Sequence, residues 1–104
     1  MNKVFLYVTT ETAADAARIG GALVEARLAA CANVLPAMTS IYRWQGEVKQ
    51  SSEAVLIVKT REDLAEAAVD RIKALHSYEC PCVVTIPVTG GNPDFLKWIE
   101  NETG

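Results

Sequence analysis

A chain of 104 residues is long enough for one ordinary domain and too short for two. Half of the residues are hydrophobic and 22% are charged, which excludes a disordered chain. The net charge of −3 comes from scattered charges without a basic stripe to neutralise phosphates, so the composition argues against nucleic acid as a partner.

Seven segments are predicted from the hydrophobic patterns. In chain order they are a strand at 3–9, a helix at 13–28, an extended segment at 30–44, a returning strand at 47–59, a helix that follows Thr60 and includes Leu75, a strand at 82–88 and a short helix at 94–100. The direct hairpin in the middle, with a tight turn at Gln45–Gly46, argues against a doubly wound α/β fold. We expect a single α+β domain over residues 1–104: a ferredoxin-like βαββαβ sandwich with a long central β-hairpin and a short C-terminal helix.

Local signals mark the starts of the two long helices. Thr12 followed three residues later by Asp15 predicts an N-cap, and Thr60 followed by Asp63 predicts a second one. The pair Gly20–Gly21 lies inside the first helix, where glycine lowers helix stability but allows close approach to a sheet.

The predicted sheet is expected to need a partner. Right-handed crossovers place both long helices on one face, while the first, third and fourth strands read as apolar on both faces. An extended hairpin arm of this length spans ~50 Å, more than the ~33 Å diameter of such a domain. We therefore expect a homo-oligomer; the alternative is a sharp bulge at Pro36 that folds the ribbon back.

The number of cysteines is typical of a protein in a reducing compartment. The chain has three cysteines, an odd number, and no secretory signal precedes them. The longest uncharged stretch, residues 28–42, is shorter than the ~20 apolar residues of a membrane helix and contains polar side chains. We expect a soluble cytoplasmic protein with free thiols and no membrane partner.

Candidate metal ligands lie between the second helix and the last strand. His76 is the only histidine, and Cys80 and Cys82 form a C-x-C pair that would point to one face of a strand. The alternatives are a histidine that serves only as a cation at a helix C-terminus, and two small buried hydrophobic residues. Cys31, among alanines, reads as core.

No catalytic pattern is present in the sequence. His76 has no nucleophile and acid at supporting spacing, and Gly90–Gly91 lacks the lysine of a phosphate loop. We therefore expect a protein that is not an enzyme. The aromatic residues Tyr42, Trp44, Tyr78 and Trp98 are concentrated at strand and helix ends, where they either line a cleft or rim the core.

A family resemblance covers nearly the whole chain in order. Its segments are 27–36 (RLAACANVLP), 40–47 (SIYRWQGE), 56–60 (LIVKT), His76-x-Tyr78-Glu79-x-Pro81 and 91–99 (GNPDFLKWI). In these segments the sequence resembles the CutA divalent-cation-tolerance family. The resemblance implies a ferredoxin-like homotrimer with strands paired between subunits, a kinship with the PII signalling proteins, and a role in tolerance to copper and other divalent cations. It also implies pockets at subunit interfaces, and the matching positions here are Trp44, Lys59, His76, Tyr78, Glu79 and Trp98.

Two departures from the family pattern affect the expected site. Ser77 follows the histidine where the family has proline, and Cys82 replaces an acidic residue. A thiol in place of a carboxylate favours softer ions such as Cu(I) or Zn(II), with no obligatory cofactor. The first hypothesis is a trimeric metal-tolerance protein that binds ions weakly through His76, Cys80 and Cys82. The second is a PII-like module that binds a small anionic metabolite with Lys59 and the aromatic residues.

Overall fold

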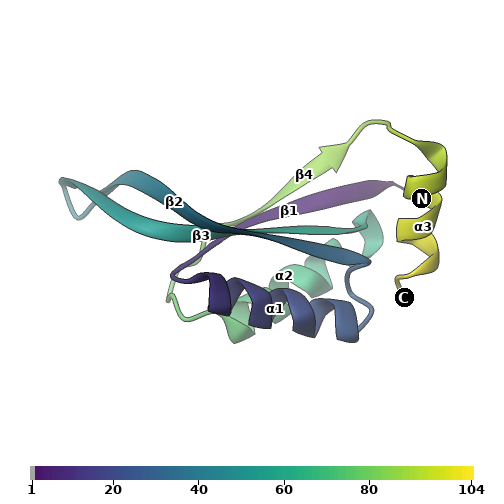
Figure 1. Cartoon of the computed structure of the whole chain (residues 1–104), viewed down its shortest axis with the longest axis horizontal. Coiled ribbons are helices and arrows are strands. Elements are labelled where there is room, and N and C mark those ends of the chain that lie inside the picture. Colours follow the sequence, from purple (N-terminus) through teal and green to yellow (C-terminus); the bar gives the residue numbers. More distant parts are fainter. Residues whose placement is uncertain (1) are drawn as a thin grey trace.

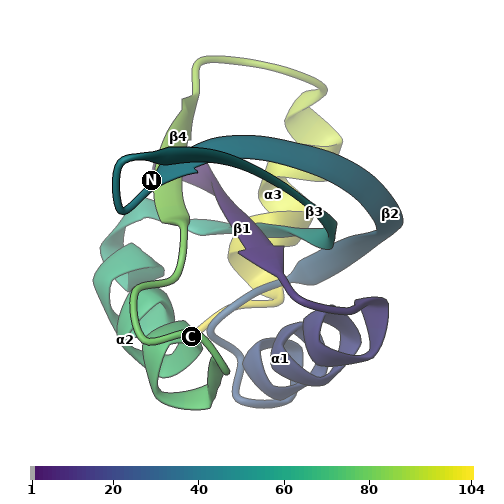
Figure 2. The ribbon, with the colours of Figure 1, turned by 90° about the vertical axis from the view of Figure 1, so that its left-hand side faces the viewer.

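A computed structural model describes residues 2–104 and has the predicted α+β, ferredoxin-like architecture. Its elements are β1 (Lys3–Thr10), α1 (Ala13–Glu25), β2 (Cys31–Trp44), β3 (Glu47–Arg61), the 3₁₀ turn η1 (Glu62–Leu64), α2 (Ala65–Leu75), β4 (Val83–Val88) and α3 (Pro93–Asn101). The four strands form one antiparallel sheet in the order β2-β3-β1-β4. Helices α1 and α2 lie side by side under one face of this sheet (Figures 1 and 2).

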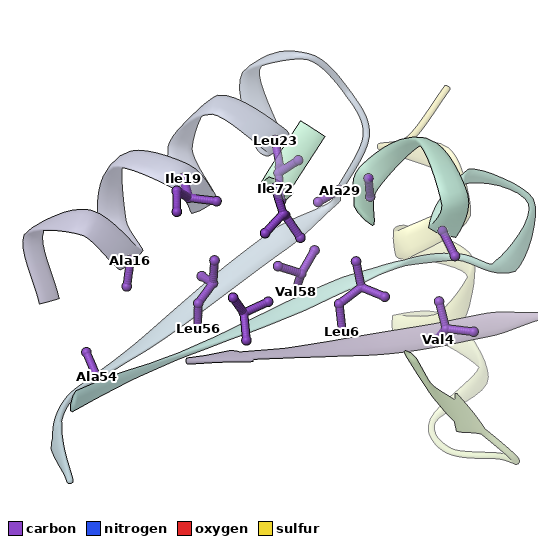
Figure 3. Packing of buried hydrophobic residues seen from close by; sticks show 13 residues of the cluster. Val4, Leu6, Ala16, Ile19, Leu23, Ala29, Ala54, Leu56, Val58 and Ile72 are labelled. Atoms are coloured by element: carbon purple, nitrogen blue, oxygen red, sulfur yellow. The ribbon is translucent and has the colours of Figure 1, made fainter. Parts of the chain in front are cut away.

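The hydrophobic core lies between the sheet and these two helices. Leu6 and Val8 of β1 are fully buried, and so are their neighbours on β3. Figure 3 shows side chains of both strands pointing toward Ile19 and Leu23 of α1 and Ile72 of α2. Because alternate strand residues point to opposite faces, the core takes every second residue of β1, and the residues between them are only half-buried.

Helix α1 begins as predicted and ends three residues early. The Thr12 side chain accepts a hydrogen bond from the Asp15 amide at 3.1 Å, which is the expected N-cap. The predicted end at residue 28 is wrong because Arg27 adopts a left-handed conformation with φ of 59°. The Leu28 amide then donates to the Leu23 carbonyl, which closes the helix end in the manner of a C-terminal capping motif.

Helix α2 does not begin at Thr60 as predicted. Thr60 remains in β3, fully buried, and its hydroxyl donates to the carbonyl oxygen of Leu28 at 2.7 Å. A 3₁₀ turn over Glu62–Leu64 separates the strand from the helix, and no side chain caps the helix start. The capping signal was wrong here because a tertiary hydrogen bond used the threonine hydroxyl.

The β2–β3 hairpin projects beyond the helices. The strand register slips between Leu35 and Met38, so an irregularity does occur at Pro36, but the ribbon does not fold back there as the alternative interpretation required. Pairing continues to Trp44 and Glu47, and the molecule measures 44 × 25 × 22 Å. The outer part of the hairpin, residues 38–53, is called the arm below; it extends away from the helical layer (Figure 1).

The sheet face opposite α1 and α2 carries apolar residues with little cover. We call this surface the open face. By strand register it includes a half-buried or exposed set: Phe5, Tyr7, Leu35, Ile57, Val84 and Ile86. Cys31 belongs to this face and is half-buried, so its predicted place in the core is wrong. The core-facing position is taken by Ala32, next along the strand.

Helix α3 covers one end of the open face and packs against β3 and β1. Asn92 caps it by accepting a hydrogen bond from the Asp94 amide at 3.1 Å, and Ile99 is its buried anchor. Within residues 2–104, no helix combines the length and the apolar character that a membrane crossing requires.

Candidate functional site

A cleft of about 910 Å³ lies between the arm and the connection from α2 to β4. It is lined by residues from β1, from the arm and from that connection: Thr9, Ser40, Tyr42, Trp44, Glu53, Ser77, Tyr78, Glu79, Cys80 and Cys82. This volume is within the range of about 300–1,000 Å³ that is usual for small-molecule sites. The cleft brings together three of the predicted ligand-binding residues, Trp44, Tyr78 and Glu79, with the two predicted metal-ligating thiols.

His76 fixes the connection onto the sheet. It stands at the C-terminal end of α2, where its Nδ1 accepts a hydrogen bond from the Tyr78 amide at 3.0 Å. The other ring nitrogen, Nε2, therefore carries the proton of the neutral ring and donates to the Thr9 carbonyl oxygen at 2.7 Å. Both ring nitrogens are occupied, so His76 can ligate a metal only if one of these bonds breaks.

Tyr78 ties the connection to the arm. Its hydroxyl donates to Oε2 of Glu53 at 2.8 Å, and its ring lies 4.9 Å from the His76 ring, centroid to centroid. Burial raises the pKa of the Tyr78 phenol well above its ordinary value, and the hydrogen bond and charge of Glu53 raise it further. The phenol therefore stays protonated and keeps its hydrogen bond throughout the physiological pH range.

The two cysteines of the C-P-C segment lie in the connection before β4 and not in a strand. Both are exposed, both are free thiols and both line the cleft, so the alternative of buried hydrophobic residues is wrong. No group of three or more His, Cys, Asp or Glu side chains in the described part of the chain is arranged to hold a metal ion. The expected convergence of His76, Cys80 and Cys82 on one ion is therefore not present in a single subunit.

Lys59 and Trp98 lie outside the cleft. The Lys59 ammonium stands 5.3 Å from the ring centre of Phe5 and 5.4 Å from that of Phe95. The Phe95 ring stacks on Trp98 with a centroid distance of 5.6 Å. These residues form a second aromatic cluster, between α3 and the sheet at the other end of the open face. Within one chain, Lys59 therefore supplies no charge to the cleft.

Five lining residues were not among the predicted metal- or ligand-binding residues: Thr9, Ser40, Tyr42, Glu53 and Ser77. Glu53 is the informative one, because it is a half-buried carboxylate at the point where β3 leaves the core. Its sequence signal is weak: a single acid beside Ser51 and Ser52, just before the apolar run that begins at Ala54.

The chain is similar to known proteins over nearly its whole length. The sequence profile of the family described as "CutA1 divalent ion tolerance protein" matches residues 4–102. The divalent-cation tolerance protein CutA of Thermus thermophilus is 45% identical over 104 residues, covering 100% of both chains. The crystal structure of CutA1 from Oryza sativa superimposes with a TM-score of 0.96 at 38% identity, covering 100% of this chain and 95% of that one.

Some relatives are longer proteins. The chloroplastic protein CutA 1 of rice is 39% identical over 100 residues, which is 96% of this chain and 56% of the rice protein. The chain thus spans little more than half the length of this plant relative, and the shared part is the sheet-and-helix domain described above.

Proposed function

The chain belongs to the CutA1 divalent ion tolerance family, and we propose that it acts in divalent-cation tolerance as a homotrimer that binds metal ions weakly. The open face is the main observation that supports assembly into a trimer. Its apolar residues, such as Ile57 and Ile86, need cover that the chain's own helices do not supply. A projecting arm with unpaired outer edges is equally suited to pair with another copy.

The metal part of the proposal rests on the thiols of Cys80 and Cys82. They are the softest ligands at the cleft, and they stand beside the carboxylate of Glu79. Such a set favours Cu(I) or Zn(II) over hard cations. Because no cluster of three ligands is assembled in residues 2–104, binding must include rearrangement of the loop or a group from a second subunit, and a weak affinity follows.

Native mass spectrometry of the reduced protein, titrated with Cu(I) or Zn(II) against a weak chelator, tests this function. We expect a trimer that gains up to one ion per subunit. The double variant Cys80→Ser/Cys82→Ser should remain trimeric and lose the ion. Its matched control is Cys31→Ser, which removes the thiol on the open face outside the cleft. A monomer contradicts the trimer, and a double variant that keeps the ion contradicts the thiol site.

His76 has a separate test, because its two hydrogen bonds assign it to loop anchoring. His76→Ala should lower the unfolding midpoint and leave ion binding by Cys80 and Cys82 in place. Loss of the ion without loss of stability would return His76 to the set of ligands.

A binding role without catalysis and a cytoplasmic location complete the proposal. The absence of a nucleophile–base pattern in the sequence supports the first. Three free thiols, two of them exposed, support the second, since exposed thiols persist in reducing compartments. The anionic-metabolite alternative has less support, because its only cation, Lys59, is held by Phe5 and Phe95 away from the cleft of its own chain.

A further inference from the structure

We propose that the cleft between the arm and the α2–β4 connection binds a small organic cation, an alkylammonium group seated against Tyr42, Trp44 and Tyr78 and balanced by Glu53 and Glu79. This inference goes beyond metal tolerance. It depends on aromatic and carboxylate side chains, whereas the metal proposal depends on thiols.

The aromatic lining is the first observation. Trp44 and Tyr42 are two residues apart on β2, so both side chains lie on the same face of the arm. In the single chain, 54% of the Trp44 surface and 41% of the Tyr42 surface are exposed. Tyr78 faces the same cleft from the connection. Tryptophan and tyrosine rings attract cations through their π-electron faces, and they do so most strongly where water is displaced. A cleft lined by three such residues resembles the aromatic cages that bind ammonium groups.

The charge of the lining is the second observation. Its only formally charged residues are the carboxylates Glu53 and Glu79; no lysine or arginine is among them. Lys49, opposite Tyr42 in the register, is engaged by Glu47 at 3.5 Å. The carboxylates of Glu53 and Glu79 therefore make the electrostatic field in the cleft negative. A cation gains from this field and an anion is repelled.

The walls of the cleft are held in place before any ligand binds. The hydrogen bond from Tyr78 to Oε2 of Glu53 joins the two sides, and His76 fixes the base of the connection to Thr9. Oε1 of Glu53 is left to receive an ammonium group. Preorganised walls reduce the ordering cost of binding, which matters for a small ligand.

The apolar part of the lining selects among cations. A hydrated metal ion gains little from aromatic rings, whereas a methylated ammonium exposes apolar methyl groups that carry the charge. We therefore assign the aromatic half of the cleft to methylated alkylammonium compounds.

The test uses the whole protein as purified, with choline chloride as the probe and isothermal titration calorimetry as the readout. The control ligand is 3,3-dimethyl-1-butanol, which has the shape of choline without its charge. We expect saturable choline binding in the low-millimolar range or tighter, and no saturable binding of the neutral alcohol. Equal binding of both ligands, or no saturation by choline at about 20 mM, would overturn the inference.

Two variants locate the site. Trp44→Leu keeps an apolar side chain on the arm and should weaken choline binding at least about threefold, as loss of one cation–π contact predicts. Glu79→Gln should weaken it to a similar degree, and its matched control Glu66→Gln, exposed on α2, should not. Unchanged affinity in both Trp44→Leu and Glu79→Gln would overturn the assignment to this cleft.

A third variant separates the two proposals. Cys80→Ser/Cys82→Ser should bind choline as the unaltered protein does, even though it is expected to lose metal. If the unaltered protein binds choline and no metal ion, the inference stands and the metal proposal fails. If the unaltered protein binds metal and no choline, the inference fails and the metal proposal stands.

Discussion

Glu100 shows how one carboxylate links α3 to the sheet. Its two oxygens accept hydrogen bonds from Lys97 at 3.2 Å and from Lys3 of β1 at 3.4 Å. These bonds hold the pKa of Glu100 below its ordinary value of 4.5. A carboxyl group whose pKa is lowered by folding stabilises the folded state above its unfolded pKa, and this contribution disappears as the pH falls through the folded pKa.

We therefore predict that Glu100→Gln destabilises the protein at neutral pH and much less at pH 3. The measurement is the urea midpoint of both proteins at pH 7 and at pH 3, with Glu66→Gln as the exposed control. A difference between Glu100→Gln and the unaltered protein that is the same at both pH values would show that charge on Glu100 is not the cause.

The family resemblance predicted only part of the cleft, because the place of a side chain also depends on tertiary contacts; the binding roles of the cleft residues stay predictions. Trp44, Tyr78 and Glu79 were selected as ligand-binding residues, and all three line the cleft. Lys59 was expected at the same pocket for the same reason, but its ammonium group lies over the rings of Phe5 and Phe95, outside the cleft. No sequence pattern indicates that contact, because Phe95 comes from a helix thirty-odd residues farther along the chain.

At the scale of elements, the two glycines inside α1 have opposite surroundings. A Cβ atom at Gly20 would stand 2.9 Å from the Ala32 Cβ and 3.0 Å from Leu56 Cδ1, whereas at Gly21 it would meet nothing within 4 Å. Helix propensity favours alanine over glycine by about 1 kcal/mol at either position. Overpacking a tight core site costs about 1–3 kcal/mol, so it outweighs that gain at Gly20.

We predict that Gly21→Ala stabilises the protein by about 0.5–1 kcal/mol and that Gly20→Ala destabilises it by up to about 2 kcal/mol. Urea unfolding of the two variants checks this directly, and each serves as the control for the other. Equal stability of the two would mean that α1 does not approach β2 as closely as the geometry indicates.

Where each long helix begins depends on the hydrogen-bond partner of the threonine hydroxyl that was predicted to cap it. The Thr12 cap was confirmed because its hydroxyl bonds to its own helix. The Thr60 cap was wrong because its hydroxyl bonds to the Leu28 carbonyl, in a segment more than thirty residues earlier. Both signals have the same spacing in the sequence, so only the packed sheet distinguishes a cap from a strand residue.

At the scale of the whole molecule, the arm carries large apolar residues on the face that points away from the cleft. Ile41 and Val48 are 69% and 66% exposed, on strands that extend past the helices. In an isolated chain such residues contribute almost nothing to stability, and polar substitution would be neutral. In an assembly they are buried by a second copy, and stability then rises with protein concentration by mass action.

We predict that Val48→Asp lowers the assembled mass toward that of a monomer and removes the concentration dependence of the unfolding temperature. A charge buried without a partner opposes association, whereas the same charge in water costs little. Ala67→Asp, exposed on α2 away from the arm, is the control and should leave both properties unchanged. Light scattering after gel filtration gives the mass, and thermal scans over a hundredfold range of concentration give the second readout. If Val48→Asp assembles like Ala67→Asp, the arm is not part of the contact, and the open face alone must account for any oligomer.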